Sequence, residues 1–440
     1  MSATVPDDAP EDDVRGRDAY AAEAEDAYVD GDRTYTPGTA RSAFQHRTFR
    51  TVYLGAFASN IGTWMQNVVL GALAWQLTRS EVFVGVMIAA QLGPLLVFSV
   101  VGGMLADNFD RKKVLIALSI QQAVFSLVLA VVTMPDDPNR VAMVVTVLCI
   151  GIGNALYAPI FGAVVPILVP RRDIAGAISL NSVQMNASRV IGPIIGTTIY
   201  SQVGPSAVFI LNAVSFGFVI LSLLRVELPN PASTGGQGLH RLLEGIEVAK
   251  RDRVVRQSLI VIFTFSFFSL AFITQMPTIA SQHLGIETKS SAYGALYACF
   301  GVGAVIGALS IGTVFAATSK AIMTRRCLVG FAAMLTIFGS LRSAAPAYLV
   351  ILVLGGVYFA VITSLSTVLQ EDLDDANRGS VMALWIMGFG GTVPFGGLAG
   401  GKAMELFGIF PVLAFGALVA LVLAGMADLR PEHEPVPATG

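Results

Sequence analysis

Charged residues are scarce in this chain of 440 residues. Asp, Glu, Lys and Arg make up 13% of it and hydrophobic residues 54%, whereas a typical soluble domain carries about 25% charged residues. The mean hydropathy is +0.69, and apolar runs of roughly 20 residues, enough to cross a bilayer, recur throughout. The composition therefore excludes an ordinary soluble domain. The short alternating segments of a membrane β-barrel are also missing, so we expect an all-α membrane protein.

Groups that bind metals or nucleotides are equally sparse. The three cysteines lie in or beside apolar runs at spacings that form no metal site, and the four histidines are scattered. The sequence contains no nucleotide-binding loop of the Walker type. We therefore expect no metal, no cofactor, no disulfide, no nucleic-acid partner and no enzymatic site.

Apolar residues are nearly absent from the start of the chain. The first 40 residues hold eleven of the thirty acids and only three arginines. Without an apolar core this stretch is no signal peptide. It is typical of a disordered acidic tail, which we place in the cytoplasm at residues 1–44.

Apolar runs separated by charge clusters and by Pro/Gly breaks predict twelve transmembrane helices. Their connections are short except for residues 227–257, which divide the chain into two sets of six. The expected fold has two six-helix, pseudo-symmetric halves. The predicted spans are 50–77, 82–106, 113–133, 140–168, 176–202, 206–226, 258–282, 290–316, 323–342, 346–370, 379–403 and 408–428.

This count divides the chain behind the tail into four parts. They are an N-terminal half (45–226), a cytoplasmic linker (227–257), a C-terminal half (258–428) and a cytoplasmic C-terminal tail (429–440). In the linker, apolar residues at helical spacing predict a short amphipathic helix along the cytoplasmic lipid surface. These residues are Leu239, Leu242, Leu243, Ile246 and Ala249.

Basic residues are distributed unevenly between the two sides of the predicted spans. Nineteen lie on the side that carries both chain ends, and the other side holds only Arg79, Arg140, Lys289, Arg342 and Lys402. Because Lys and Arg accumulate in cytoplasmic loops, we expect both termini in the cytoplasm. The expected location is the cell's inner (cytoplasmic) membrane, crossed many times.

The two halves resemble each other weakly. The segment "GPIIGTTIYSQVG" (192–204) lies opposite "GGLAGGKAMELFG" (396–408), with three glycines matched 204 residues apart. In the same way, Arg111 corresponds to Lys320 at a spacing of 209 residues. Two parallel six-helix repeats are a known plan of transporters, with the substrate site near mid-membrane where the repeats meet.

The turn "GGMLADNFDRKK" (102–113) gathers charges between two apolar runs. It resembles the loop motif G-x-L-A-D-R-x-G-R-[RK] of the major facilitator superfamily, with Asn108 replacing an Arg and Asp110 replacing the second Gly. Together with "TWMQNVVLGALAWQLTRS" (63–80) and "NASRVIGP" (186–193), it makes the chain similar to the bacterial enterobactin-exporter-like, drug-efflux branch. The resemblance extends from the first span to the last.

The resemblance implies that this turn is a latch between the halves. Gly103 would allow close helix approach, Asp107 would face the positive N-terminus of the eleventh span, and Arg111 would meet carboxylates ending the tenth. Such contacts would close the cytoplasmic side in one state and break in another. The alternative is a role in topology alone, which we prefer for Lys112 and Lys113. The predicted latch residues are Gly103, Asp107, Arg111, Glu371, Asp372, Asp374, Arg378 and Gly379.

Polar and aromatic residues inside the spans predict the lining of a central cavity. By family analogy the first, fourth, seventh and tenth spans line the pathway. Any single residue of this kind more often forms a hydrogen bond between helices. Together, however, they indicate an amide and aromatic lining suited to amphiphilic molecules. The candidates are Asn60, Trp64, Gln66, Asn67, Gln91, Asn154, Tyr157, Gln184, Arg189, Thr274, Gln275, Tyr297 and Tyr358.

Arg189 lies near the middle of the fifth span, where an unpaired charge costs at least about 2.5 kcal/mol. Two interpretations are open. The guanidinium binds an anion or contributes to coupling in the cavity, or it pins the helix by hydrogen bonds to the first or fourth span.

Gly192, Pro193 and Gly196 in the same span resemble the G-P-x-x-G antiporter motif of exporters, with Thr197 replacing the last Gly. Proline bends a helix and glycine allows tight contact. The motif favours export, with a simple packing kink as the alternative. No Asp or Glu lies in the middle of any predicted span, so proton coupling is implied by the family alone.

The expected function is secondary-active export of small amphiphilic or anionic, drug- or siderophore-like molecules by alternating access. The expected partners are the transported small molecule, the lipid bilayer and a coupling proton, and we expect a monomer. The alternative is an importer or a lipid or lysophospholipid flippase of the same fold. A non-transporting receptor or a membrane-embedded enzyme is less favoured.

Overall fold

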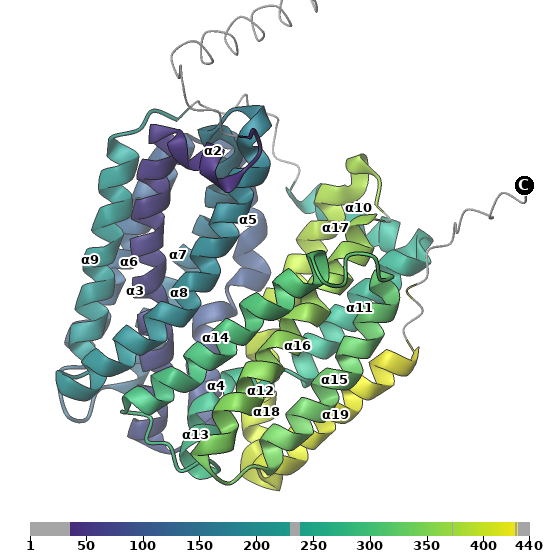
Figure 1. Ribbon diagram of the computed structural model, residues 1–440. Helices are drawn as coiled ribbons and strands as arrows, with labels where there is room; N and C mark the ends of the chain where they lie inside the picture. Colours follow the sequence, from purple (N-terminus) through teal and green to yellow (C-terminus); the bar gives the residue numbers. More distant parts are fainter. Residues whose placement is uncertain (1–35, 229–237, 372, 427–428, 430–440) are drawn as a thin grey trace, which may run out of the picture.

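The computed structural model describes residues 36–228, 238–371, 373–426 and 429. In this part of the chain every regular element is helical, and two groups of helices stand side by side (Figure 1). Ten segments in it are long and apolar enough to cross a membrane. The predictions for the acidic tail before residue 36, for Asp372 and for the side chain of Asp107 fall outside what is described.

The N-terminal half contains six crossing segments, several of which begin at a polar cap. The Asn139 side chain accepts the Ala142 N–H at 3.0 Å, and the Asp110 side chain accepts the Lys113 N–H at 3.1 Å. Such caps satisfy donors that the start of a helix leaves unpaired. The segments are α3 (Arg47–Thr78), α4 (Glu81–Leu92) with α5 (Leu95–Asn108), α6 (Arg111–Val132), α7 (Arg140–Val164), α8 (Ile174–Gln202) and α9 (Pro205–Leu224).

The C-terminal half contains six further crossing segments. Its first helix begins at Arg253, five residues before the predicted start of the seventh span, because the Asp252 side chain caps it by accepting the Val255 N–H at 2.9 Å. The segments are α11 (Arg253–Phe268) with α12 (Ala271–Thr274) and α13 (Met276–Gln282), α14 (Ser291–Gly312), α15 (Lys320–Ser340), α16 (Ala344–Glu371), α17 (Asp375–Ile386) with α18 (Val393–Phe407), and α19 (Ile409–Met426).

Helices α3 and α8 stand beside the ten apolar segments but are not among them. With 32 and 29 residues, they are long enough for a hydrocarbon core of about 30 Å at 1.5 Å per residue. They carry polar residues such as Asn60, Thr63 and Asn181, which face the inside of the N-terminal half. The inward-facing polarity explains why these two crossings are less apolar than the rest.

Three of the predicted spans are interrupted rather than continuous. Gly93 and Pro94 separate α4 from α5, Pro277 follows the break between α12 and α13, and a π-helical turn (Met387–Gly391) separates α17 from α18. Proline lacks an N–H and clashes with the preceding turn, so helices end before it and restart at it. The interrupted segments all lie near the junction of the two halves.

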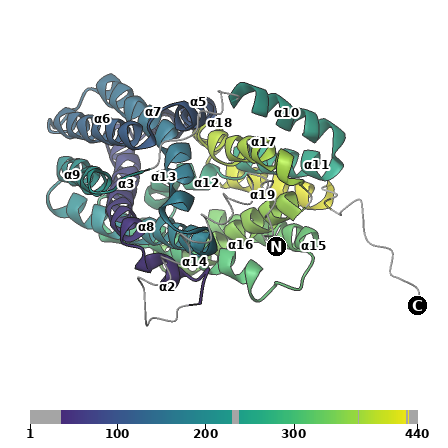
Figure 2. The same cartoon turned by 90° about the horizontal axis from the view of Figure 1, so that it is seen from above.

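The halves meet along two helix pairs, since α4 packs on α18 and α8 packs on α14. In Figure 1 they converge toward the end that carries α13 and the start of α4, and diverge toward the end that carries α2 (Ala40–Gln45) and α10 (Gly238–Arg251). We call these the narrow end and the wide end. Seen from above, the purple-to-blue half lies on one side and the green-to-yellow half on the other (Figure 2).

Aromatic rings fill the inside of the C-terminal half. The ring of Phe331 lies 4.8 Å from that of Phe265 and 5.9 Å from that of Phe272, centroid to centroid. Tyr358 stacks on Phe265 at 6.2 Å and on Phe300 at 6.0 Å. Buried aromatic pairs at these spacings add to the stability gained by burial, so this half has a densely packed core.

The internal repeat is visible as a shared contact at the wide end. Arg111 Nε donates to the Ala106 carbonyl at 2.8 Å, and Lys320 Nζ donates to the Phe315 carbonyl at 2.9 Å. Both carbonyls lie at or just past the carboxyl end of the preceding helix, where the last C=O groups lack helical partners. Arg111 and Lys320 therefore occupy equivalent positions in the two halves.

Helix α10 packs on α17 at the wide end. A Cβ at Gly245 would lie 2.6 Å from the Ser380 carbonyl oxygen, so the glycine allows this close approach. Leu243 and Ile246, on the predicted apolar side, are 60% and 41% exposed. The linker helix thus contacts the protein through its small residue and leaves two larger apolar side chains on the surface.

Candidate functional site

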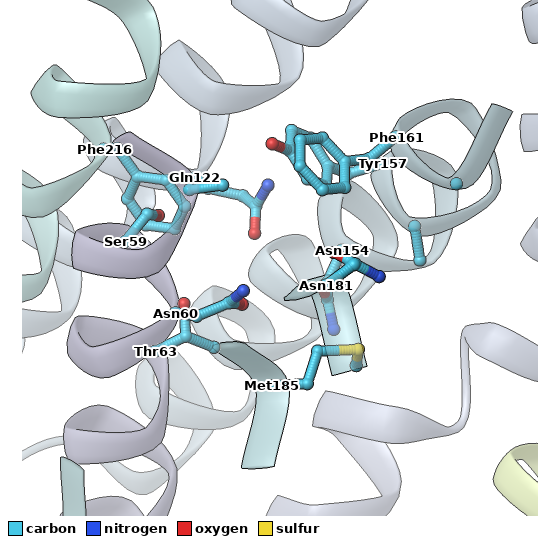
Figure 3. Close-up of a pocket in the computed structure, with 13 residues that line it drawn as sticks. Ser59, Asn60, Thr63, Gln122, Asn154, Tyr157, Phe161, Asn181, Met185 and Phe216 are labelled. Carbon is cyan, nitrogen blue, oxygen red and sulfur yellow. The ribbon is translucent and has the colours of Figure 1, made fainter. Parts of the chain in front are cut away.

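A cavity of about 170 Å³ lies inside the N-terminal half (Figure 3). Its lining comes from α3, α6, α7, α8 and α9, in the part of these helices closer to the wide end. Ala158, Gly162 and Met185 at its rim are exposed. The lining residues are Ala56, Ser59, Asn60, Thr63, Gln122, Asn154, Tyr157, Ala158, Phe161, Gly162, Asn181, Met185 and Phe216.

The lining is polar but carries no charged side chain. Four amides, those of Asn60, Gln122, Asn154 and Asn181, can each donate and accept hydrogen bonds. Beside them, the ring of Tyr157 stacks on Phe161 with centroids 5.5 Å apart. Amides combined with flat apolar rings suit a molecule that has both polar and aromatic parts.

Three of the predicted cavity residues, Asn60, Asn154 and Tyr157, do line this cavity. Gln122, from the third span, was not predicted, and Asn181, on the polar side of the fifth span, was not among the named candidates. The available signal was the same for all of them, an amide inside an apolar run. The family analogy directed attention to the first, fourth, seventh and tenth spans and so away from these two.

Gln66, Asn67 and Gln91 are bonded to other helices instead of lining the cavity. Gln66 Oε1 accepts from Ser126 Oγ at 3.1 Å and from Asn212 Nδ2 at 2.9 Å, which links α3, α6 and α9. Gln91 Nε2 donates to Asn67 Oδ1, which links α4 to α3. In this conformation each of these amides is used in packing the half together.

Arg189 lies between two aromatic rings. Its guanidinium carbon is 5.0 Å from the Trp64 ring centroid and 4.6 Å from that of Phe359. Trp64 belongs to the N-terminal half and Phe359 to the C-terminal half, so the cation spans the junction. Two cation–π contacts of about 0.5–2 kcal/mol each offset much of the cost of about 2.5 kcal/mol for a charge at this depth.

Two other predicted cavity residues lie near this cation. Tyr358 belongs to the aromatic core and is close enough to Arg189 for an electrostatic interaction. Gln184 is only 1% exposed, and neither its side-chain oxygen nor its nitrogen has a hydrogen-bond partner within the described part of the chain. An unsatisfied buried amide is costly, which marks this stretch of α8 as unusual.

Thr274 and Tyr297, two further predicted cavity residues, pack against neighbouring residues. Thr274 is buried, its hydroxyl donates to the Ala271 carbonyl at 3.0 Å, and it fills the space beside Gly397. Tyr297 packs edge-on against Tyr293 with ring centroids 5.3 Å apart. Neither lines the cavity of the N-terminal half.

Hydrogen bonds between the halves close the narrow end. Gln275 Nε2 donates to the Glu81 carbonyl at 2.9 Å, and Gln282 Nε2 donates to the Glu81 carboxylate at 3.0 Å. Ser80 Oγ donates to Glu405 Oε1 at 3.1 Å. Gln275, predicted in the cavity, is thus part of this closure. Glu81, only 7% exposed, was not predicted at all, because its position before an apolar run looked like an ordinary loop.

The glycines of the predicted antiporter motif are points of close helix contact. A Cβ at Gly192 would lie 2.6 Å from Trp64 Cβ, and one at Gly196 would lie 2.9 Å from Met65 Cα, so both bring α8 against α3. Pro193 lies inside the continuous helix α8, where Thr197 Oγ1 donates to its carbonyl at 2.8 Å. A bond from a threonine hydroxyl to the carbonyl four residues back is common inside helices.

Arg111 is apart from the predicted carboxylates of the latch that the structure describes. Arg111 bonds to its own turn and makes no ion pair with Glu371 or Asp374, both of which are described and exposed. Arg378 Nη2 approaches the Leu373 carbonyl at 3.5 Å. Nothing lies within 4 Å of a Cβ added at Gly379, at the start of α17.

The prediction that Gly103 serves close packing is wrong for this conformation. A Cβ added at Gly103 would meet nothing within 4 Å, whereas one at Gly102 would lie 2.6 Å from Pro159 Cγ and 2.7 Å from the Leu156 carbonyl oxygen. Gly102 therefore brings α5 against α7. Gly103 is on another side of the helix, at the end where the halves diverge.

A buried carboxylate at the wide end was also missed. Asp173, 1% exposed, accepts the Gly38 N–H at 2.9 Å and bonds His46 Nε2 at 2.8 Å. Burial alone would raise the pKa of this carboxyl, but hydrogen bonds from His46, Gly38 and Ser42 lower it below the usual 3.8. The contact fastens the segment around α2 to the start of α8.

Known proteins with similar sequences are transporters. Residues 38–437 match the transmembrane secretion effector family. The enterobactin exporter EntS of Escherichia coli O6:K15:H31 is 26% identical over 410 residues, 90% of this chain and 96% of that protein. EntS of Shigella boydii serotype 4 is 26% identical over 409 residues, with the same coverage.

Solved structures share the fold at lower identity. The nucleoside transporter NupG matches with a TM-score of 0.68 and 15% identity over 86% of this chain and 98% of that chain. The human organic anion transporter MFSD10 matches with a TM-score of 0.62 and 17% identity over 87% of this chain and 99% of that chain. The predicted fold class is thereby confirmed.

The family match covers nearly all of the chain, and the fold of two six-helix groups agrees with it. This protein belongs to the transmembrane secretion effector family of the major facilitator superfamily, and it is a multi-pass secondary transporter rather than an enzyme.

Proposed function

We propose that this protein exports small amphiphilic molecules from the cytoplasm by alternating access, with its wide end facing the cytoplasm. The observation that carries the proposal is the uncharged, amide-lined cavity on the wide-end side of a junction that is hydrogen-bonded shut at the narrow end. Such a state can load substrate from one side only. The surplus of basic residues at the wide end supports a cytoplasmic position for it and for both termini.

In this conformation the proposed latch would be open. Arg111 and the exposed Glu371 and Asp374 are separate here, and we propose that they approach when the wide end closes and the narrow-end bonds to Glu81 break. A contact made in one state and lost in the other shifts the balance between them. The similarity to the enterobactin exporters supports export as the direction.

A proton is the coupling ion that we propose. The family supports this assignment, and so does the position of Glu81, a carboxylate buried between the halves at the closed end. Opening the narrow end would break the bond from Gln282 and expose this carboxylate to the external water.

Everted membrane vesicles, whose cytoplasmic face points outward, test the proposal. We expect vesicles with this protein to take up 1-pyrenebutyrate or its neutral methyl ester, faster with an acidic interior than without a pH gradient. Export from the cytoplasm appears as uptake in this geometry. If neither probe accumulates above vesicles without the protein, the proposed export of amphiphiles is wrong.

Asp107→Asn tests the latch in the same vesicles. We expect normal membrane insertion and strongly reduced uptake. Asp110→Asn is the matched control in the same turn, because asparagine also caps a helix and Asp110 serves as the N-cap of α6. Uptake at the wild-type rate by Asp107→Asn would remove the latch from the mechanism.

A further inference from the structure

Arg189 is a cation at the junction of the halves with few partners for its N–H groups. Its single hydrogen bond among the described residues goes to Asn186 Oδ1, one turn back on α8, at a long 3.4 Å. No described carboxylate lies within ion-pair distance of it. A guanidinium has five N–H donors, so most of them are left for something else.

This arrangement disagrees with the interpretation that Arg189 holds α8 in place by hydrogen bonds to neighbouring helices. The pin interpretation requires carbonyl or amide acceptors on α3 or α7. The described contacts of Arg189 with other helices are instead with the ring faces of Trp64 and Phe359 and, electrostatically, with Tyr358. Aromatic faces hold the cation without using its N–H edge. The charge is therefore kept in place while its donors remain available.

Arg189 continues the lining of the amide cavity. Asn181 and Met185 line the cavity, and Arg189 follows at the same four-residue spacing on α8, about 6 Å farther along the helix axis. On α3, Trp64 directly follows Thr63, which also lines the cavity. The cation thus lies one helical turn beyond the cavity, toward the narrow end.

Two polar groups beside Arg189 are also unsatisfied. The Gln184 amide and the Ser188 hydroxyl are buried without a hydrogen-bond partner in the described part of the chain. Buried polar groups in folded proteins almost always have partners, and exceptions call for a ligand or another explanation. Gln184, Ser188 and Arg189, on one stretch of α8, thus all have unused hydrogen-bonding capacity. This points to a polar group of a ligand that binds there.

We propose that Arg189 binds an anionic group of the transported molecule, a carboxylate or another oxyanion with two adjacent oxygens. The planar N–H edge of a guanidinium matches two such oxygens. The aromatic part of the molecule would rest against Tyr157 and Phe161 in the cavity. This inference rests on the proposed export function and narrows its substrate to amphiphilic anions.

Binding of matched probes to purified protein in phosphatidylcholine nanodiscs tests the inference. We expect wild type to bind 1-pyrenebutyrate about tenfold more tightly than its methyl ester, because only the carboxylate can pair with the guanidinium. In Arg189→Gln this preference should vanish, with the affinity for the ester unchanged. Fluorescence anisotropy of the pyrene group measures both. An unchanged preference in Arg189→Gln overturns the inference.

Arg189→Lys keeps the inference testable if the glutamine variant does not fold. Lysine retains a cation over the rings but lacks the planar pair of N–H donors of a guanidinium. The preference of this variant for 1-pyrenebutyrate over the ester should therefore be about fivefold smaller than that of wild type. Equal preference in the two proteins overturns the inference. Asn186→Ala removes the long hydrogen bond from Arg189 and the Asn186 bond to the Ser182 carbonyl, but it keeps the cation, so it should bind both probes as wild type does.

The source of the anion is decided by adding phosphatidylglycerol to the nanodiscs. If the lipid displaces 1-pyrenebutyrate from wild type but not from Arg189→Lys, the anion is a lipid headgroup phosphate. If it does not compete, the anion is a soluble molecule. Uptake of the ester into vesicles without any carboxylate preference would leave export intact and remove only the anion site.

Discussion

The N-terminal half is hollow and polar where the C-terminal half is filled and aromatic. In the first, Asn60, Gln122 and Asn154 surround a cavity of about 170 Å³. In the second, Phe331 and Tyr358 belong to a cluster of rings with centroids 4.8–6.5 Å apart. The two halves thus share the same arrangement of helices but differ in the side chains that fill their interiors.

This difference assigns different tasks to the halves. Amides that line a cavity stay available to a ligand, whereas the same groups in a packed interior must find partners inside the protein. Close-packed rings leave little room for local rearrangement. The N-terminal half therefore has amide groups available to a ligand, and the C-terminal half contributes one ring, Phe359, to the cation at the junction.

The tight packing of the C-terminal half is most easily broken at Gly307. An added Cβ there would overlap the carbonyl oxygen of Gly356 on α16. We expect Gly307→Ala to destabilise the protein by more than about 5 kcal/mol, beyond the usual range for a point mutation. Unlike a side chain, the backbone carbonyl of Gly356 cannot rotate away from the added methyl group. Size-exclusion chromatography of detergent extracts measures the loss of folded protein.

Gly312 is the matched control on the same helix. Nothing lies within 4 Å of a Cβ added there, so Gly312→Ala should give a normal yield of folded protein. Equal yields of the two variants would mean that α14 and α16 are not packed as tightly as described.

Removing one aromatic ring from each half sharpens the contrast. Phe331→Ala removes a buried ring that contacts Phe265 and Phe272 and should cost about 3–5 kcal/mol. Phe161→Ala removes a ring that faces the cavity, so it should cost less stability but reduce probe uptake per folded molecule. Thermal unfolding and vesicle uptake, measured on both variants, separate the two effects.

One result would contradict the described difference between the packed half and the hollow half. If Phe161→Ala destabilises the protein as strongly as Phe331→Ala does, the cavity residues serve mainly to hold the N-terminal half together.

The smallest expected effect concerns how each half is fastened at the wide end. The buried carboxylate of Asp173 holds α2, whereas α10 packs closely on α17 at Gly245 and accepts one hydrogen bond from Ser380 through the exposed carboxylate of Glu244. Because the pKa of Asp173 is lowered in the folded protein, its stabilising effect is fully present above pH 3.8 and is lost as the pH falls toward the folded value. Protection of α2 amides from hydrogen exchange should decline over that range.

Asp173→Asn should reproduce this loss at neutral pH, at a local cost of about 1–2 kcal/mol. Amide protection of α10 should stay the same in this variant, since its contacts include no part of α2. A variant in which α2 remains as protected as in wild type would show that packing, and not the carboxylate, holds that segment.

Sequence reasoning predicted the helical part of the fold well. The spans follow from apolar runs between charges, and helix boundaries such as Arg111 and Arg140 coincide with polar caps. The interruptions at Gly93 and at Met387–Gly391 were missed, because a glycine or a long apolar run is compatible with both a continuous and a broken helix. Only the partners on the neighbouring helix decide between them.

The candidate site was predicted less completely. Arg189 and Trp64 were each identified from their position inside a span, but their pairing with Phe359 depends on how the two halves meet. Gln66 and Asn60 look alike in sequence, as amides in the same apolar helix. One bonds to Ser126 and Asn212 and the other faces the cavity, because they lie on different sides of α3.

By itself, the sequence determined that the chain lies in a membrane, how many times it crosses, and which charged group lies at mid-depth. These properties depend on the transfer of single residues between water and lipid, which is a local quantity. Tertiary structure alone decided which amides are consumed in packing, which end is shut, and what surrounds Arg189. Those properties depend on contacts between segments far apart in the chain, and no local pattern encodes them.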